Sequence, residues 1–304
     1  MLIVRNILKQ YANHVALDRV SMEIHQGSIF GLLGPNGAGK TSLIRIINQI
    51  TAPDEGEILL NGKRLQPADI SRIGYLPEER GLYKKMEVGE HVLYLSRLKG
   101  LSRSEAMERV KYWFRKMDIE AWWKKKVEEL SKGMQQKVQF IATVLHEPEL
   151  LILDEPFTGF DPVNADLIKQ EILELNRKGT TVIFSTHRME SVEELCDSIV
   201  LINKAKKILE GRLSDIKARY RNNTYLLTYQ GDARNALSAH PEKFRVLSHE
   251  HDPQNGIGQL KVQLMNGVGS NELLEILIAS VQVQGMHEVV PGIHDIFVRS
   301  VKES

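Results

Sequence analysis

Residues 34–41 of this chain read Gly-Pro-Asn-Gly-Ala-Gly-Lys-Thr, and few folds can hold such a segment. It follows the apolar run Ser28–Leu33, which suits a buried strand, and it precedes residues 42–48, whose apolar side chains recur at helical spacing. The pattern G-x-x-x-x-G-K-[ST] between a strand and a helix is typical of a loop that wraps phosphate groups. The sequence therefore predicts an α/β fold and a nucleoside triphosphate as ligand.

Each residue type in this loop has a chemical reason. Glycines let successive backbone N–H groups turn toward phosphate oxygens, and the helix that follows adds the partial positive charge of its N-terminus. Lys40 places a cation at the β- and γ-phosphates, and Thr41 offers a hydroxyl to Mg²⁺. The residues expected to contact the nucleotide here are Gly34, Pro35, Asn36, Gly37, Ala38, Gly39, Lys40, Thr41 and Ser42.

A second pattern lies at residues 150–156, where the apolar run Leu150–Leu153 ends in Asp154, Glu155 and a proline. A strand that ends in two acids puts carboxylates at the carboxyl edge of a sheet, beside the phosphate loop. Asp154 can hold Mg²⁺, directly or through water, and Glu155 can orient a water that attacks a phosphate. The alternative is that these residues only form a turn that caps the next element.

The order of the expected elements indicates the sheet type. Strands and helices alternate over residues 150–210, which together with the phosphate loop predicts a mostly parallel sheet with its ligand at the carboxyl ends of the strands. Residues 88–146 are expected to be mainly helical, and Ser102–Glu105 forms a capping box at one helix start. A tight hairpin is expected at Asn61-Gly62. The early strands are expected to form an antiparallel group: Leu2–Gln10, Leu17–His25, Ser28–Leu33 and Gly56–Leu60.

The chain from about Tyr220 has a different pattern. Its expected order of strand, helix, strand, strand, helix, strand is that of a ferredoxin-like domain. The expected elements are Thr224–Gln230, Ala233–Ala239, Phe244–His249, Gly258–Met265, Asn271–Val281 and Met286–Val290. The sequence thus predicts a small α+β domain at residues 220–304.

Composition limits the class of protein. Hydrophobic residues make up 42% and charged residues 26% of the chain, as in soluble globular proteins. The net charge of +1 gives no bulk attraction to nucleic acid, so no nucleic acid partner is expected. The single cysteine, Cys196, cannot form an internal disulfide, which suits a reducing cytosol. No apolar run is long enough to cross a bilayer, so a role at a membrane requires a separate integral protein.

A third segment, Leu130–Lys137, reads Leu-Ser-Lys-Gly-Met-Gln-Gln-Lys shortly before the acidic strand, and a later strand ends in Phe184–His187. Phosphate loop, Leu-Ser-x-Gly-x-Gln-Gln segment, Asp-Glu strand and strand-end histidine in this order resemble the ATPase subunit of ABC transporters over roughly residues 1–212. The resemblance implies a mixed sheet core, an antiparallel β subdomain and a helical subdomain at about residues 86–146. It also implies ATP and Mg²⁺ as cofactors and ATP hydrolysis as the activity.

The resemblance assigns roles to further residues. Two ATPase subunits, expected to be identical, would sandwich two ATP molecules, with Ser131 and Gly133 of one subunit facing the γ-phosphate held by the other. His187 would contact the γ-phosphate, and Asp161 would lie in a loop that links the two sites. Tyr11 would stack on adenine, unless it is only a strand-end tyrosine of the core. The expected catalytic residues are thus Lys40, Glu155 and His187.

Several positions depart from the family's usual residues. Glu78 follows Ile-Gly-Tyr-Leu-Pro where family members commonly have glutamine; a carboxylate can ligate Mg²⁺, but it adds negative charge near the γ-phosphate. Lys132 replaces a usual glycine, and it either adds a cation to the shared site or points to solvent. Met134 and Phe160 replace a usual glutamine and leucine. Hydrolysis is expected to survive these changes, with three expected metal ligands: Thr41, Glu78 and Asp154.

The segments Glu78–Tyr83 and His294–Arg299 are similar to those of ATPases of sodium-extruding and drug-exporting transporters, whose permeases are separate chains. The resemblance implies a cytoplasmic subunit, peripheral on the inner face of the cell membrane, that drives a separate integral-membrane permease through the surface near residues 78–87. Two alternatives stay open. A soluble ABC-type ATPase acting on ribosomes or DNA usually has two ATPase halves or a long coiled coil. A phosphate-loop kinase would not explain Leu130–Met134.

Overall fold

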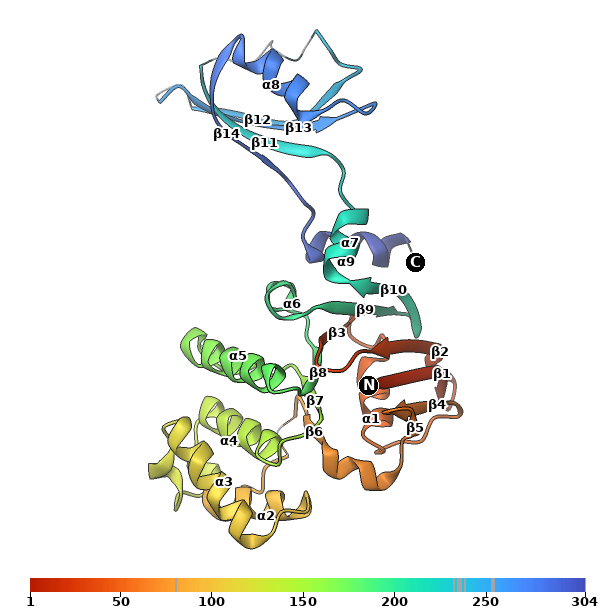
Figure 1. Ribbon diagram of the computed structural model, residues 1–304, viewed down its shortest axis with the longest axis vertical. Helices are drawn as coiled ribbons and strands as arrows, with labels where there is room; N and C mark the ends of the chain where they lie inside the picture. Colours follow the sequence, from red (N-terminus) through yellow and green to blue (C-terminus); the bar gives the residue numbers. More distant parts are fainter. Residues whose placement is uncertain (80, 232, 234–236, 238, 253–254, 304) are drawn as a thin grey trace. The chain divides into compact units, whose positions relative to one another are not determined.

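The computed structural model describes residues 1–79, 81–231, 233, 237, 239–252 and 255–303. The chain divides into two compact units, which are treated separately below (Figure 1). The first unit comprises Met1–Leu213 together with the residues from Phe297 onward, and the second comprises Ser214–Ile296. Among the described residues, no helix combines the length and the apolar character needed to span a bilayer.

The first unit is built on a six-stranded sheet in the order β10-β9-β3-β8-β7-β6. Neighbouring strands are parallel except for β10, which runs antiparallel to β9, so the predicted mostly parallel sheet is confirmed. The strands are β3 (Ile29–Leu33), β6 (Ile73–Leu76), β7 (Leu150–Asp154), β8 (Thr181–Ser185), β9 (Ser198–Asn203) and β10 (Lys206–Arg212). Every residue of β3, β7 and β8 is buried, as both-sided burial of a parallel sheet requires.

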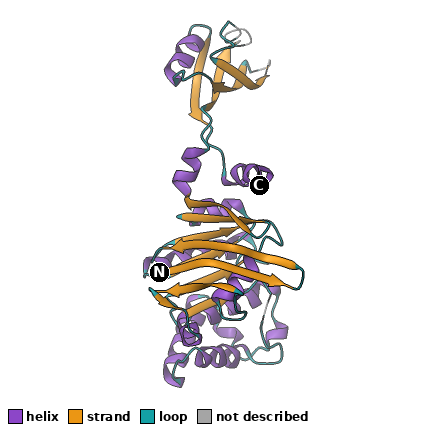
Figure 2. Ribbon diagram, turned by 90° about the vertical axis from the view of Figure 1, so that its right-hand side faces the viewer, coloured by secondary structure: helices purple, strands orange, loops and turns teal. Residues whose placement is uncertain are grey.

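A second, antiparallel sheet has the order β2-β1-β4-β5, and its strands lie side by side in Figure 2. They are β1 (Leu2–Tyr11), β2 (His14–Ile24), β4 (Glu55–Leu60) and β5 (Lys63–Arg64). The hairpin between β4 and β5 turns at Asn61 and Gly62, whose φ angles of 51° and 78° are those of the expected tight turn. The prediction that β3 belongs to this antiparallel group was wrong. Its continuous apolar sequence suits burial on both faces, and β3 lies between β8 and β9 instead.

Helix α1 (Lys40–Ile47) joins the two sheets into one core. Its apolar residues Leu43 and Ile47 are fully buried and belong to the same hydrophobic cluster as Leu2 of β1 and Ile152 of β7. Burial of side chains of this size contributes about 1.5–3 kcal/mol each before entropy is counted. The start of α1, and with it the phosphate loop, is therefore held by packing on both sides.

A helical region and several further helical segments complete the first unit (Figure 1). The capping box predicted for α3 is present, because Ser102 Oγ accepts from Glu105 N–H at 3.3 Å and the Glu105 carboxylate accepts from Ser102 N–H at 3.0 Å. The helical region contains α2 (Val88–Leu98), α3 (Arg103–Lys116), α4 (Lys132–Val144) and the 3₁₀ turns Glu120–Trp122 and Val127–Glu129. The others are α5 (Pro162–Arg177), α6 (Met189–Leu195) and the 3₁₀ turn Pro67–Arg72, while α7 (Leu213–Arg219) and α9 (Ile293–Glu303) contain the unit boundaries.

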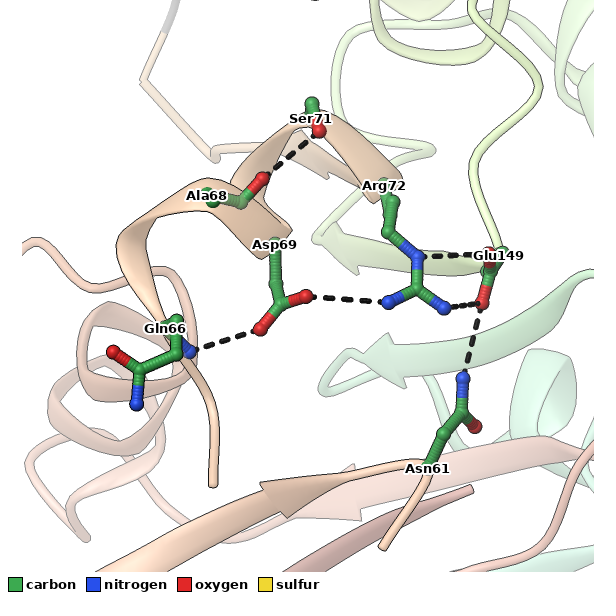
Figure 3. Close-up of polar contacts among 7 residues, drawn as sticks. All are labelled: Asn61, Gln66, Ala68, Asp69, Ser71, Arg72 and Glu149. Carbon is green, nitrogen blue, oxygen red and sulfur yellow. Dashed lines mark hydrogen bonds and ion pairs between the residues drawn. The ribbon is translucent and has the colours of Figure 1, made fainter. Parts of the chain in front are cut away.

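A polar network holds the amino ends of β6 and β7 together (Figure 3). Arg72 donates twice to Glu149, at 2.8 and 2.6 Å, and once to Asp69 at 3.2 Å. Asn61 of the hairpin donates to the same Glu149 carboxylate at 3.1 Å. Since β6 pairs with β7 from Ile73↔Leu150 onward, these contacts lie at the end of the strands opposite to the predicted acidic residues.

The second unit is a four-stranded antiparallel sheet in the order β12-β13-β11-β14 with helix α8. Its elements are β11 (Thr224–Gly231), β12 (Phe244–Asp252), β13 (Ile257–Leu264), α8 (Ser270–Ile278) and β14 (Val281–Glu288). The helix expected at 233–239 falls largely outside the described residues, so the full ferredoxin-like pattern stays a prediction. The last strand was expected at 286–290, but β14 begins at Val281, because Val281 and Val283 alternate with polar residues and face the buried cluster.

Candidate active site

A cavity of about 450 Å³ opens in the first unit where the phosphate loop meets the carboxyl ends of β6, β7 and β8. Most of the predicted site residues line it: Tyr11, Asn36, Gly37, Gly39, Lys40, Thr41, Ser42, Glu78, Asp154, Glu155 and His187. The structure thus brings together segments that are separated by up to 176 residues along the chain, from Tyr11 to His187. Gly34, Pro35 and Ala38 belong to the same loop but do not line the cavity.

The loop keeps its shape only with glycine at two positions. Gly34 and Gly39 have φ angles of 153° and 114°. A Cβ atom at Gly34 would lie 2.3 Å from the carbonyl oxygen of Ile202, and one at Gly39 would lie 2.3 Å from that of Ala16. Both the positive φ and the close backbone neighbours exclude other residues, so these glycines let the loop lie against β9 and β2.

Lys40 is bent back over the loop. Its ammonium group donates to the carbonyl oxygens of Gly34 and Pro35 at 2.7 and 3.1 Å. Burial lowers the pKa of Lys40, and the nearby carboxylates Asp154, Glu155 and Glu78 oppose that shift. A cation with only neutral acceptors as hydrogen-bond partners is free to exchange them for phosphate oxygens.

Two carboxylates follow β7, and they differ in setting. Asp154 is 5% exposed, and burial together with repulsion from Glu78 and Glu155 raises its pKa. Glu155 has φ 51°, in the left-handed region that costs a non-glycine residue free energy. Its backbone N–H donates to the carbonyl oxygen of Ser185 at 2.8 Å, which anchors this conformation.

The side chain of Glu155 is held by residues at the end of β8. Thr186 Oγ1 donates to one carboxylate oxygen at 3.0 Å, and the backbone N–H of His187 donates to the other at 2.8 Å. The Nδ1 atom of His187 lies 2.7 Å from the same oxygen. The His187 side chain is 70% exposed while that of Glu155 is 12% exposed, so the imidazole faces the open cavity and the carboxylate is fixed behind it. Such a carboxylate can take a proton from a water or orient it.

The oxygen donors of the cavity fit a magnesium ion. Thr41, Glu78 and Asp154 all line it, and together they offer one hydroxyl and two carboxylates. The described residues contain no group of three or more histidine, cysteine or acidic side chains poised to hold a metal ion. At nucleotide sites Mg²⁺ prefers a few oxygen ligands from the protein, and water and phosphate oxygens occupy its remaining positions.

The aromatic edge of the cavity contains the predicted Tyr11 and also His14, which the sequence did not predict as a site residue. Tyr11 lies at the end of β1, is 41% exposed and has Lys9 Nζ 5.3 Å from its ring centroid. His14 lines the cavity beside it, at the start of β2. The only available signal was its place in the short turn after Tyr11, and a turn histidine alone does not predict a site.

Three predicted residues lie elsewhere, in a group called the second patch: Ser131, Gly133 and Asp161. Ser131 caps α4, where its Oγ accepts from Met134 N–H at 3.3 Å. A Cβ atom at Gly133 would lie 3.4 Å from the carbonyl oxygen of Gly159, so the start of α4 adjoins the loop that leads to Asp161. Asp161 caps α5 and accepts from Asn164 N–H at 3.0 Å. None of the three lines the cavity.

Comparisons with known proteins agree with this geometry. Residues 17–158 match a family described as ABC transporter, and residues 211–301 match one described as ATP-binding protein DrrA1-3-like, C-terminal domain. The chain is 39% identical over 301 residues to the uncharacterized ABC transporter ATP-binding protein YhaQ of Bacillus subtilis (strain 168), covering 99% of this chain and 98% of that protein. It is 34% identical to the linearmycin resistance ATP-binding protein LnrL of the same organism, covering 87% and 85%. A solved structure of an ATP-binding subunit of an ABC transporter superposes with TM-score 0.68 at 32% identity, covering 72% of this chain and 93% of that one.

Proposed function

This chain belongs to the ATP-binding proteins of ABC transporters, and we propose that it binds ATP with Mg²⁺ in the cavity described above and powers export through a separate membrane permease. ATP hydrolysis is the activity of this family. The observation that carries the proposal is the convergence of the phosphate loop, Asp154, Glu155 and His187 on one cavity of about 450 Å³. Three segments with donors suited to a metal-bound triphosphate meet there.

The proposed chemistry assigns each group one task. The backbone N–H groups of residues 36–41 and the Lys40 ammonium would hold the phosphates, and Thr41, Glu78 and Asp154 would hold Mg²⁺, which would neutralise charge on the phosphate oxygens. Glu155 orients the attacking water, because its carboxylate is fixed by Thr186 and His187. Tyr11 stacks on the base.

The second patch supports a sandwich of two copies. Ser131 and Gly133 lie at the N-terminus of α4, a helix of 13 residues with no acidic residue in its first turn. Such a terminus favours an anion, yet the cavity of the same chain does not include these residues. Lys132, the first residue of α4, is exposed and adds a cation to this surface. A second copy placed face to face would bring the second patch to the γ-phosphate.

An apolar groove near Glu78 supports a permease interface. It has a volume of about 350 Å³ and lies between α2, α4 and β6, with Leu82 and Leu95 in its wall. At its rim the apolar residues Ile50 and Leu98 are 61% and 64% exposed, and binding of a partner over the groove would bury them. We assign this groove to a helix of the permease; under this assignment the protein would lie on the inner face of the membrane that holds its partner.

The alternatives fit less well. The comparisons do not support a soluble ATPase acting on ribosomes or DNA, because the relatives that the chain matches along almost its whole length are ABC transporter ATP-binding proteins. The exporter assignment draws on the name of the linearmycin resistance relative and on the match of residues 211–301. The substance that is moved is determined by the permease.

The proposal is tested in the full chain with two variants, each paired with a control variant. Lys40→Ala should abolish tight ATP binding in equilibrium dialysis, while Lys204→Ala, a change at an exposed lysine outside the cavity, should not. Leu98→Glu should prevent co-purification with an integral membrane protein from detergent-solubilised membranes, whereas Ile278→Glu, an equally exposed residue of the second unit, should not. Unchanged nucleotide affinity in Lys40→Ala would contradict the site, and unchanged co-purification in Leu98→Glu would contradict the interface.

A further inference from the structure

The sheet of the second unit has an open edge at β12. This strand is the outermost in its sheet, and among the described residues it pairs with β13 alone. Two apolar residues of β12, Val246 and Leu247, are 47% and 44% exposed. An edge strand presents unpaired backbone N–H and C=O groups to any strand that approaches it, and exposed apolar side chains favour that approach. The edge of β12 is therefore a surface that fits an added strand.

The hydrogen bonds to β13 show which backbone groups of β12 point to the free edge. Met265 N–H donates to the carbonyl oxygen of Lys243 at 2.8 Å. The adjoining pair, Phe244↔Leu264, is therefore a non-hydrogen-bonded pair. Val246 lies two residues farther along the strand and has the same setting. Its backbone N–H and C=O therefore point away from β13, toward the free edge.

A β-bulge in the middle of β12 sets the phase of the rest of the strand. The register shifts just after Val246, and Leu247 is the extra residue. Val246 pairs with Val262, which is buried in the core of the unit. Beyond the bulge His249 pairs with Leu260, which belongs to the same core. Because side-chain face and backbone direction alternate together along a strand, the backbone of His249 also points to the free edge.

The charges of β12 are complementary to those of a second β12 that runs in the opposite direction. Two such strands opposed about their bulges bring Val246 of each copy against His249 of the other, and both have backbone groups at the free edge. The same register brings Arg245 of each copy against Glu250 of the other. Both residues are exposed, and neither forms an ion pair with another described residue. A slip of one residue would separate these charges and turn opposing side chains to different faces.

We propose that the second unit binds the second unit of another copy of this chain, by antiparallel pairing of the two β12 edges. The pairing joins two four-stranded sheets into one and covers Val246 and Leu247. Two Arg245–Glu250 pairs, one on each side of the two-fold axis, fix its register. The contact lies outside the nucleotide cavity, so it requires no ATP. In the proposed sandwich the two contacts would reinforce each other, because each raises the effective concentration for the other.

The test uses the full chain with Ser248→Cys and without nucleotide. Ser248 lies beside the two-fold axis in the proposed register, so the two introduced thiols come within reach of a disulfide. Wild type has only Cys196, which is buried. Under mild oxidation Ser248→Cys should form covalent dimers on non-reducing gels. Wild type and Gln282→Cys, at an exposed residue of the opposite edge strand β14, should not.

Charge reversal in the Ser248→Cys chain tests the register. Arg245→Glu places two acids opposite each other on both sides of the axis, and it should slow formation of the covalent dimer at least about fivefold. Glu250→Arg should do the same, and the two reversals together should restore the rate. Glu275→Arg, at an exposed glutamate of α8, is the matched control and should leave the rate unchanged.

Two results would overturn the inference. One is the absence of a covalent dimer in Ser248→Cys although a thiol reagent shows that the introduced cysteine is accessible. The other is an equal rate in Arg245→Glu and in the double reversal, with correct folding shown by circular dichroism. Addition of Lys40→Ala should leave the cross-linking unchanged, so a failure of the proposed nucleotide site would be seen separately.

Discussion

Glu155 shows how the contacts around one residue hold a side chain that is proposed to be catalytic. Its φ of 51° costs of order 1–3 kcal/mol, and it persists because the surrounding contacts determine it. The backbone N–H is bonded to Ser185 and the carboxylate to Thr186 and His187. All of these contacts come from the end of β8, so the pairing of β7 with β8 fixes the direction in which the carboxylate points.

Removing the charge of this carboxylate separates binding from hydrolysis. Glu155→Gln keeps the size of the side chain but is a much weaker base, so hydrolysis should fall by about 10²-fold or more while ATP still binds. ATP-bound pairs of chains should accumulate and elute earlier in size-exclusion chromatography. Phosphate release gives the rate, and Glu147→Gln, a change at an exposed glutamate outside the cavity, serves as control. A variant that stays monomeric in ATP contradicts the two-copy sandwich.

At the scale of single residues, the sequence indicated several candidate site residues, because each of them stands in a short local pattern. Lys40, Thr41, Asp154 and Glu155 stand in short patterns whose chemistry does not depend on distant residues. The bond between Glu155 and His187 could not be predicted, since it depends on the register Asp154↔Ser185 between two strands. His14 was missed for a similar reason, because only the pairing of β1 with β2 brings it beside Tyr11.

At the scale of elements, the alternation of strands and helices and the capping residues predicted where many elements lie. Which strands pair with one another in a sheet was harder to predict from the sequence. β3 was grouped with its neighbours in sequence, but its burial on both faces places it in the parallel sheet. The loop after it therefore opens at the carboxyl ends of parallel strands. The contacts that align β6 with β7 likewise join residues far apart in sequence, from Asn61 to Glu149.

The network of Figure 3 is the first element-scale test. Arg72→Ala removes two parallel bonds to Glu149 and should lower the free energy of unfolding by about 1 kcal/mol, a modest effect because both side chains are about half exposed. Denaturant titration measures it, and Arg64→Ala, at an exposed arginine of β5, is the control. Combining Arg72→Ala with Glu149→Ala should cost less than the sum of the single changes. Strict additivity would show that the two residues do not interact.

The contact between α3 and α5 gives a pH dependence. Hydrogen bonds from Lys116 and Lys178 lower the pKa of Glu174 to about 2, from an ordinary value of 4.5. A depressed carboxyl pKa means stability that is present above about pH 4.5 and lost as the pH falls toward 2. Glu174→Gln should therefore lower the melting temperature at pH 7. The corresponding loss in the free energy of unfolding should be only about 0.5 kcal/mol, because Glu174 is 38% exposed and solvent screens its ion pairs. The difference should shrink toward pH 3, and a difference independent of pH would contradict this account.

For the whole molecule, the proposed sandwich requires that one chain carry two incomplete halves of a site. The cavity holds the phosphate loop and the acids, and the second patch holds Ser131, Gly133 and Asp161 without lining that cavity. A sequence pattern can indicate both halves, because each is a short segment. It does not contain the distance between them, which follows only from the fold of the first unit.

Mixing two inactive variants tests whether the halves join between copies. In Lys40→Ala the phosphate loop is impaired, and in Ser131→Arg the second patch is blocked by a bulky side chain, so each should be inactive alone. A mixed pair contains one site built from an intact loop and an intact second patch. Random pairing makes about half of the pairs mixed, so the mixture should recover about a quarter of wild-type phosphate release. Addition of Glu155→Gln to the Ser131→Arg chain should abolish the recovery, because the one intact site uses the phosphate loop and the Glu155 of that chain. An inactive mixture, in which pairing is shown by crosslinking, would mean that Ser131 acts within its own chain.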